Sequence, residues 1–409
     1  MIDAGDTAWL LISAGLVMLM TPALAMFYGG MVQGKHVLST FMHSFFALGL
    51  VTVQFTVIGY SLCFGTSWHG VIGGLDYFGL SGVGDAAVSA DIKVPHLAYM
   101  AYQCMFAVIA PALISGAYAE RMKFSAYALF TLGWTTLVYD PIAHWSWGPG
   151  GWLAELGAID FAGGTVVHLS SGVSALVCAL VIGKRRGYPS VRHPPHDLTM
   201  TVIGAGILWF GWFGFNGGSA MGANGLAARA LVNTHVAAAA GALAWVLFEG
   251  LRIKKVTMLG FASGLVAGLV AITPAAGFVT PMTALLIGGI AGGVCYGAVL
   301  VKSRLGYDDA LDAFGVHGIG GATGALLTGL FARAIDNKLH GGGLDLLGKQ
   351  ALAVGAAAAW AAVVTFVLLK GIDRLCGLRV EAETEHDGLD GALHGESAYG
   401  SPSGVAHGT

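Results

Sequence analysis

The chain contains eleven stretches of mostly apolar residues, each close to the length that a helix needs to cross a lipid bilayer. Such a helix takes about 20 residues, because the hydrocarbon core is about 30 Å thick and a helix rises about 1.5 Å per residue. Charged residues make up only 11% of the chain, against about 25% in soluble proteins. We predict an all-α polytopic membrane protein. Its eleven transmembrane helices cover residues 7–31, 41–65, 97–118, 124–145, 161–183, 198–215, 226–251, 256–275, 281–302, 310–332 and 350–371.

The basic residues orient these helices. If the N-terminus lies outside, the cytoplasmic loops and tail hold 15 Lys and Arg residues and the outer side holds 5, together the 20 in the chain. This bias follows the positive-inside rule, so we predict the N-terminus outside and the C-terminus in the cytoplasm. No Lys or Arg precedes the first apolar stretch, so we expect a true span there and not a signal peptide.

Eleven helices divide into two sets of five plus one. With an odd number of helices per set, the second set enters the membrane from the opposite face, which gives an inverted repeat with its site near the midplane. From residue 372 onward the sequence becomes acidic and polar. Such a segment cannot bury a core of its own. We therefore predict a membrane domain at 1–371 and a docked cytoplasmic regulatory tail at 372–409.

Two histidines lie inside these apolar spans. His168 is in the fifth span and His317 is in the tenth, so they occupy corresponding places in the two sets of five. An ionisable side chain at that depth is costly and usually marks a pathway or a site. Asp160 and Asp312 precede or open the same two helices, where a carboxylate can cap the helix start. The sequence therefore predicts a paired site on the axis of a duplicated membrane protein.

Glycine is unusually common, with 64 residues among 409. Small residues let membrane helices approach closely. Two candidate contact motifs are G260-x-x-x-G264-x-x-x-G268 and G289-x-x-x-G293-x-x-x-G297.

Other functional classes find little support in the sequence. The five cysteines are scattered and form no C-x-x-C pair, so we expect neither a disulfide framework nor a metal site. No basic cluster suggests nucleic-acid binding, and no phosphate-binding loop suggests transport driven by ATP.

Several long motifs occur in a fixed order along the chain. They are F27-Y-G-G30, A119-E-R121 followed by F124-S-A126, D160-F-A-G-G-T-V-V-H168, G211-W-F-G-F-N-G-G-S219, D308-D-A-L-D-A-F-G-V-H-G-I-G-G321, and a tail pattern that includes G377-L-R-V380, G388-L-D390, H394-G-E396 and A398-Y399. With these motifs the chain resembles the Amt/Mep/Rh family of ammonium transporters over essentially its whole length. The resemblance implies a transporter and not an enzyme, with no cofactor.

In that family a vestibule on the outer side recruits the ammonium cation, and the matching positions here are Trp147, Ser219 and Phe106. An indole face offers cation–π attraction of about 0.5–2 kcal/mol, and a hydroxyl oxygen accepts one N–H. The resemblance implies a pore gate of Phe106 and Phe215 below the vestibule, whose apolar rings exclude water. These aromatic residues are typical of the Amt branch and disfavour a Rh-like gas channel.

The resemblance also implies that His168 and His317 share a hydrogen bond within the pore. Two neutral imidazoles can do so, since each has one donor and one acceptor nitrogen. One ring could accept the proton of ammonium, so that ammonia and the proton cross separately, whereas potassium has no proton to give. Asp160 could bind the cation directly, but its position at a helix start favours a structural and electrostatic role.

The resemblance further implies a homotrimer with one pore per subunit, in the cell (inner) membrane of a prokaryote. It also implies transport of ammonium or ammonia, with methylammonium as a further candidate, and a PII-type signalling protein as a partner at the cytoplasmic face. Two rival hypotheses remain open at this point. The same fold could serve as an ammonium sensor, and paired intramembrane histidines bind haem in other folds.

Overall fold

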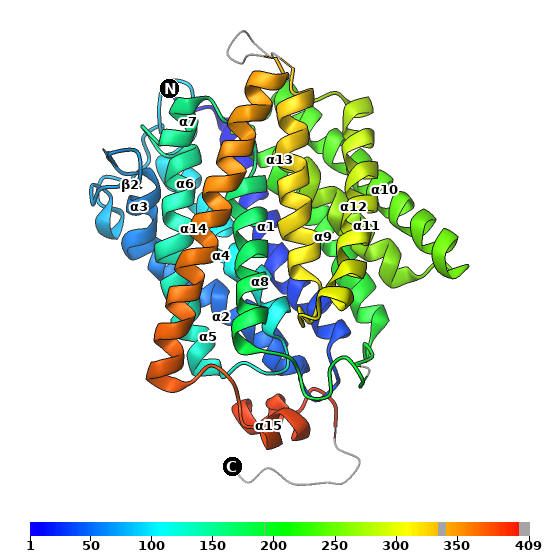
Figure 1. Cartoon of the computed structure of the whole chain (residues 1–409). Coiled ribbons are helices and arrows are strands. Elements are labelled where there is room, and N and C mark those ends of the chain that lie inside the picture. The colour runs from blue at the N-terminus through cyan, green and yellow to red at the C-terminus, as the bar shows by residue number, and fades with distance from the viewer. Residues whose placement is uncertain (192, 334–340, 401–409) are drawn as a thin grey trace.

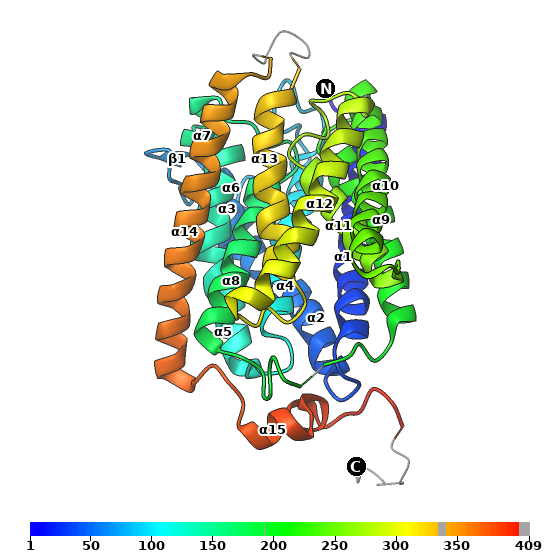
Figure 2. The ribbon, with the colours of Figure 1, turned by 45° about the vertical axis from the view of Figure 1, so that its right-hand side comes forward.

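The computed structural model of the chain describes residues 1–191, 193–333 and 341–400. These residues form a tall bundle of helices (Figures 1 and 2). Its long helical segments are α1 (Ala4–Met31), α2 (Val37–Gln54) continued by η1 (Phe55–Gly59) and α3 (Tyr60–Phe64), α4 (His96–Tyr118), α5 (Phe124–Trp134) continued by η3 (Thr135–Tyr139) and α6 (Asp140–Trp147), η4 (Gly164–Leu169) continued by α8 (Ser170–Ile182), α9 (Leu198–Gly218), α10 (Gly225–Ile253), α11 (Met258–Ile272), α12 (Pro281–Leu305), η5 (Phe314–Gly318) continued by α13 (Ile319–Phe331), and α14 (Leu344–Cys376).

The connections add short elements to this bundle. A two-stranded antiparallel sheet pairs β1 (Ser67–Trp68) with β2 (Ile72–Gly73). The others are η2 (Phe78–Leu80), α7 (Trp152–Leu156), α15 (Ala382–Asp387) and η6 (Asp390–His394). The expectation of a mostly helical chain is therefore confirmed.

Within the described residues, nine helical segments are long and apolar enough to cross a membrane. Each of the nine overlaps one of the predicted spans. The other two predicted spans are also helical, but they are not among the nine. One is the segment Phe124–Trp147, and the other is α11, which has only 15 residues. Pro274 follows α11 closely, and a proline cannot continue the backbone hydrogen bonding of a helix.

The two ends of the bundle carry different parts of the chain. The N-terminus lies at one end, and α15 lies across the opposite end, which we call the tail end (Figures 1 and 2). Because α1 runs from the N-terminal end to the tail end, its first and last residues mark the two ends of the bundle.

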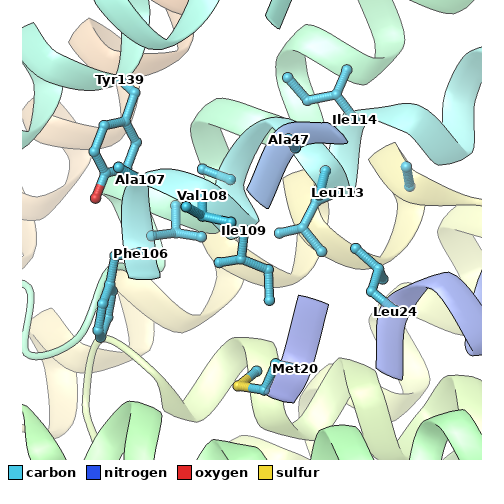
Figure 3. Packing of buried hydrophobic residues seen from close by; sticks show 14 of the residues in the cluster. Met20, Leu24, Ala47, Phe106, Ala107, Val108, Ile109, Leu113, Ile114 and Tyr139 are labelled. Carbon is cyan, nitrogen blue, oxygen red and sulfur yellow. The ribbon is translucent and has the colours of Figure 1, made fainter. Parts of the chain in front are cut away.

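The centre of the bundle is α4, whose residues from Phe106 to Tyr118 are all buried. Figure 3 shows Phe106, Ile109 and Leu113 of α4 packed among Met20 and Leu24 of α1 and other buried side chains. Helices at the rim, such as α14, keep many apolar side chains exposed. An apolar rim around a packed centre is the arrangement expected of a chain whose solvent is lipid.

The two histidine-bearing segments cross at glycines. Both open with a π-helical turn, η4 or η5, and both carry a glycine four residues after the histidine. A Cβ on Gly172 would lie 2.0 Å from the backbone nitrogen of Gly318, and a Cβ on Gly321 would lie 2.8 Å from the carbonyl oxygen of Gly164. Only glycine allows two backbones to approach this closely, so the crossing holds His168 and His317 at a fixed separation.

The predicted glycine motifs are half correct. Gly268 of the first motif contacts α10, where an added Cβ would lie 2.3 Å from the carbonyl oxygen of Ala237. In the second motif Gly293 packs against the Phe248 ring of α10, but Gly289 and Gly297 face open space. The residue of α12 that packs on Ala237 is Gly288, one position before Gly289.

The tail beyond α14 is docked on the bundle of its own chain. The Asp390 carboxylate accepts hydrogen bonds from the backbone N–H groups of Leu38 (3.0 Å) and Ser39 (2.8 Å) at the start of α2. The Tyr399 hydroxyl lies 2.7 Å from Nε2 of His196. The last long helix continues to Cys376, five residues beyond the predicted boundary at 371.

Candidate functional site

Three cavities follow one another through the centre of the bundle. The upper cavity, of about 180 Å³, lies near the N-terminal end, the middle cavity has only about 10 Å³, and the lower cavity has about 40 Å³. The upper cavity is lined by Tyr99, Gln103, Phe106, Trp147, Phe161, Ser219 and Met221. The middle cavity is lined by apolar side chains together with His168, Trp212, Phe215 and His317. Phe27, Val266 and His317 line both the middle and the lower cavity, so these two are neighbours.

Two phenylalanines separate the upper and middle cavities. Phe106 lines the upper one and Phe215 the middle one, and their rings stack with centroids 4.2 Å apart and an interplanar angle of 29°. Phe106 comes from the central helix α4 and Phe215 from α9. Both side chains are at most 1% exposed. The structure thus brings the two predicted gate residues into direct contact.

The predicted recruitment residues meet above this pair. The Trp147 indole donates a hydrogen bond to the carbonyl oxygen of Asp160 (2.9 Å), which fixes the ring beside the cavity, edge to face with Phe106. The Ser219 hydroxyl donates to the carbonyl oxygen of Phe215 (2.9 Å). Because its proton is engaged there, the Ser219 oxygen keeps lone pairs that can accept an N–H from a ligand.

The two histidines lie below the phenylalanines and face each other. Their ring centroids are 5.4 Å apart and their planes differ by 21°, and the side chain of His168 also stacks on Trp212 and Phe215. His168 is 1% exposed and His317 is 4% exposed. Each comes from a π-helical turn, a local geometry that is frequent at functional sites.

The expected hydrogen bond between the two rings is not formed in this structure. Neither ring nitrogen of His168 has a hydrogen-bond partner among the described residues, and neither does Nδ1 of His317. The rings lie nearly parallel, whereas a shared hydrogen bond requires one N–H to point at the other nitrogen. Polar atoms without partners in an apolar cavity are available to a ligand.

Asp160 has a structural position. One carboxylate oxygen accepts the backbone N–H groups of Gly163 (2.9 Å) and Gly164 (2.8 Å), and the other accepts those of Thr165 (2.8 Å) and Val166 (3.2 Å). The carboxylate therefore satisfies the free N–H groups at the start of η4 and agrees with the capping role inferred from sequence.

The corresponding cap of η5 is Asp309 and not Asp312. The Asp309 carboxylate accepts the N–H groups of Ala313 (3.1 Å) and Phe314 (2.8 Å). Asp312 has a positive φ of 61° and pairs with Lys302 instead. The expectation for Asp312 was wrong because three aspartates precede this helix and the tertiary contacts decide which of them caps it.

Trp212 lines the middle cavity, and sequence reasoning missed it. Its ring lies 5.3 Å from that of His168, and its indole donates to the Thr273 hydroxyl (2.9 Å). The signal was present, since Trp212 precedes Phe215 by three residues and the i, i+3 spacing places both on one face of a helix. Other histidines of the spans do not line these cavities, among them His144 and His235. His144 bonds Cys63 and Ser67, and His235 stacks on Trp209.

The middle cavity also bears on the haem hypothesis. A cavity of about 10 Å³ has room for about one water, so a porphyrin cannot lie between these histidines without a large rearrangement. Among the described residues, no group of three or more His, Cys, Asp or Glu side chains is placed to hold a metal ion.

Residues 8–399 of the chain match the Ammonium Transporter Family. A relative named ammonium transporter, from Bacillus subtilis, is 50% identical over 401 residues, which are 97% of this chain and 98% of the relative.

Solved structures give the same result. Mep2 of Saccharomyces cerevisiae is 38% identical with a TM-score of 0.88, over 93% of this chain and 88% of that one. A structure named Sensor Amt Protein is 31% identical with a TM-score of 0.89, over 95% of this chain and 98% of that one. The family and the curated relative are named for ammonium transport and not for an enzyme activity, and the apolar helices agree with a multi-pass membrane protein. The chain belongs to the ammonium transporter family.

Proposed function

We propose that this chain transports ammonium or ammonia across the cell (inner) membrane along the three successive cavities. The observation that carries the proposal is the order of groups on that path. A polar, aromatic cavity comes first, a stacked phenylalanine pair second, and two buried histidines with unpartnered nitrogens third. Each group suits one step in moving a small cation that can release a proton.

Recruitment takes place in the upper cavity. Ammonium carries one positive charge and four N–H donors. The Trp147 ring attracts the charge, the Ser219 oxygen accepts one N–H, and Phe106 forms the apolar floor. Asp160 acts indirectly, because its carboxylate is occupied by four backbone N–H groups. Methylammonium has the same charge and N–H donors and is a further substrate.

Discrimination takes place at the gate and the histidines. The Phe106 and Phe215 rings must part for anything to pass, and their apolar faces exclude the water that would accompany a hydrated ion. Below them, an ammonium ion gives its proton to a free nitrogen of His168 and continues as ammonia through the apolar cavity. The proton passes on through the His168–His317 pair, and potassium has no proton to give.

Around this path we propose eleven transmembrane helices as two inverted sets of five plus α14, with the N-terminus outside and the tail end in the cytoplasm. Helices η4–α8 and η5–α13, which cross at glycines and carry the histidines, are the fifth of each set. The assembly is a homotrimer, and the docked tail is the regulatory region that faces a PII-type signalling protein.

Charge movement across proteoliposomes tests the proposal. A jump in ammonium concentration on one side should give a transient inward current, and the same jump in potassium should give none. The His168→Ala variant should reduce the ammonium current at least tenfold, because the proton then has no acceptor below the gate. His235→Ala, which changes a histidine outside the path, is the matched control.

An undiminished selective current in His168→Ala would refute the proton relay. If the wild type gives no current, internal alkalinisation of the same liposomes would indicate that ammonia alone crosses. Without either signal, and without growth rescue of a transport-deficient strain, the chain would be a sensor, the function named for one of its structural neighbours.

A further inference from the structure

A fourth cavity, of about 380 Å³, lies at the tail end and plays no part in the transport path. Its walls come from the loop before α2, the segment after α4, the segment after α8 and the tail helix α15. The tail contributes Glu385 and His386, so the cavity exists in this form only while the tail is docked.

His36 is a buried wall residue of this cavity and has an unsatisfied hydrogen-bond donor. The residue is 1% exposed, and its Nδ1 accepts the backbone N–H of Leu389 (3.2 Å) from the tail. Burial lowers the pKa of His36, which keeps the imidazole neutral near pH 7. A neutral ring whose Nδ1 is an acceptor must carry its proton on Nε2. That Nε2–H has no acceptor among the described residues.

His193 repeats the arrangement on another wall. Its Nδ1 lies 3.0 Å from the side-chain nitrogen of Gln33, a donor, and 3.8 Å from a Glu120 carboxylate oxygen. With Nδ1 as the acceptor of the shorter contact, the proton of the neutral ring again lies on Nε2. Burial lowers the pKa of His193 as well. Its Nε2 is buried and also has no partner within the described part of the chain. Two imidazole donors in one cavity therefore lack acceptors, an arrangement that is costly unless something else supplies them.

The charges of the cavity favour an anion. Its two carboxylates are already engaged, since Glu120 pairs with Arg185 (2.9 Å) and Glu385 pairs with Arg379 (2.6 Å). The Arg186 side chain lines the cavity and forms no ion pair with any described residue. The Lys35 ammonium, which donates to the carbonyl oxygen of His386, contributes a further positive charge on the same wall as His36.

We propose that this cavity binds a small polyanion, one that carries several phosphate or carboxylate oxygens, and that the bound anion holds the tail in its docked position. The four donor side chains are those of Lys35, His36, Arg186 and His193. A volume of about 380 Å³ is within the range of about 300–1,000 Å³ typical of small-molecule sites. A ligand that binds only the docked form shifts the tail towards docking by mass action. This binding does not depend on the proposed transport function.

Binding can be measured on the purified full-length protein in detergent. Sodium pyrophosphate and sodium citrate are titrated separately, with sodium chloride at matched ionic strength, while the unfolding temperature is recorded. We expect a saturable rise with at least one of the two anions and none with chloride. A response to pyrophosphate alone identifies a phosphate ligand, and a response to citrate alone identifies a carboxylate ligand.

Variants assign the site. Arg186→Gln and His193→Phe should each weaken the apparent affinity about tenfold, because each removes a donor to a charged oxygen. Arg304→Gln removes an exposed arginine outside this cavity and should leave the affinity unchanged. In wild type, the bound anion should also slow protease cleavage within residues 381–399.

The proposal would be overturned if neither anion gave a saturable response. It would also be overturned if Arg186→Gln and His193→Phe both kept the affinity of the wild type. Saturable binding without protection of the tail would refute the coupling to docking. Because affinities are compared, and not absolute unfolding temperatures, a variant with lower stability remains informative.

Discussion

At the scale of the single residue, two aspartates fix the starts of the histidine-bearing helices. Asp160 accepts four backbone N–H groups and Asp309 accepts two. A helix start inside a membrane protein has no water to satisfy these groups, so each carboxylate replaces the missing solvent. The position of each histidine then depends on an acid several residues away.

Replacing Asp160 with Asn should therefore destabilise the protein. The amide keeps the shape but offers one acceptor oxygen in place of two, so about half of the four hydrogen bonds are lost. We expect a loss of about 2 kcal/mol or more in the free energy of unfolding, with reduced ammonium transport. Thermal unfolding in detergent measures the effect, with Asp3→Asn, at the exposed start of α1, as the control. Equal stabilities of the two variants would contradict the capping role.

The residues of this region also show where sequence reasoning ends. Asp160 stands alone before its helix, so its capping role could be predicted. Before η5 stand Asp308, Asp309 and Asp312, which bond Arg185, the helix start and Lys302 respectively. Asp308 bonds Arg185, which lies more than 100 residues away in the chain, and Asp312 adopts a positive φ. Local sequence contains neither fact.

At the scale of the element, the crossing of η4–α8 with η5–α13 determines the geometry of the path. Ala at Gly172 would place a methyl group 2.0 Å from a backbone nitrogen of the other segment, and Ala at Gly321 would place one 2.8 Å from a backbone oxygen. Because backbone atoms cannot rotate away as side chains do, the two segments would have to move apart.

We therefore expect Gly172→Ala to abolish transport or folding and Gly321→Ala to reduce transport strongly. Gly355→Ala on α14 is the matched control, since its added methyl group meets open space and alanine favours a helix by up to about 1 kcal/mol. Ammonium uptake and the yield of folded protein give the comparison. Normal uptake by Gly172→Ala would show that the crossing is not rigid.

Elements were easier to predict than their contacts. The long helices lie where the apolar stretches predict them, because length and hydropathy are local properties of the sequence. The prediction of the α12 face that packs on α10 was wrong by one residue, because Gly288 and not Gly289 makes the contact. That choice depends on the rotation of the helix about its axis, which only the neighbouring helices fix.

At the scale of the whole molecule, the tail end is held together by buried ion pairs. Arg185 pairs with Glu120 and Asp308, each at 2.9 Å. Burial alone would raise the pKa of both carboxyls, but the Arg185 guanidinium outweighs it and holds both pKa values below their ordinary 4.5 and 3.8. A carboxyl whose pKa is lower in the folded than in the unfolded protein stabilises the fold at pH values above its ordinary pKa. This contribution is lost as the pH falls through the pKa of the folded protein.

The stabilising contribution of these two ion pairs should therefore be fully present above about pH 4.5 and be lost below about pH 4. The amides of Gln33 and Arg185 donate to these two carboxylates and report on them directly. Their hydrogen-exchange protection, corrected for the intrinsic pH dependence, should fall over that range while amides in the middle of α4 stay protected. If these amides instead lost protection as the pH was raised, the predicted direction of the pH dependence would be wrong.

The glycine crossing has a consequence for how the proposed pore can diverge. Where a pore wall is made of side chains, a single truncation widens it and a single enlargement narrows it. Here the wall beside the histidines is two touching backbones, which offer nothing to truncate and no space to fill. New substrate sizes would thus have to arise elsewhere, from exchanges at Phe106, Phe215 or Trp212, whose rings can be replaced without moving a helix.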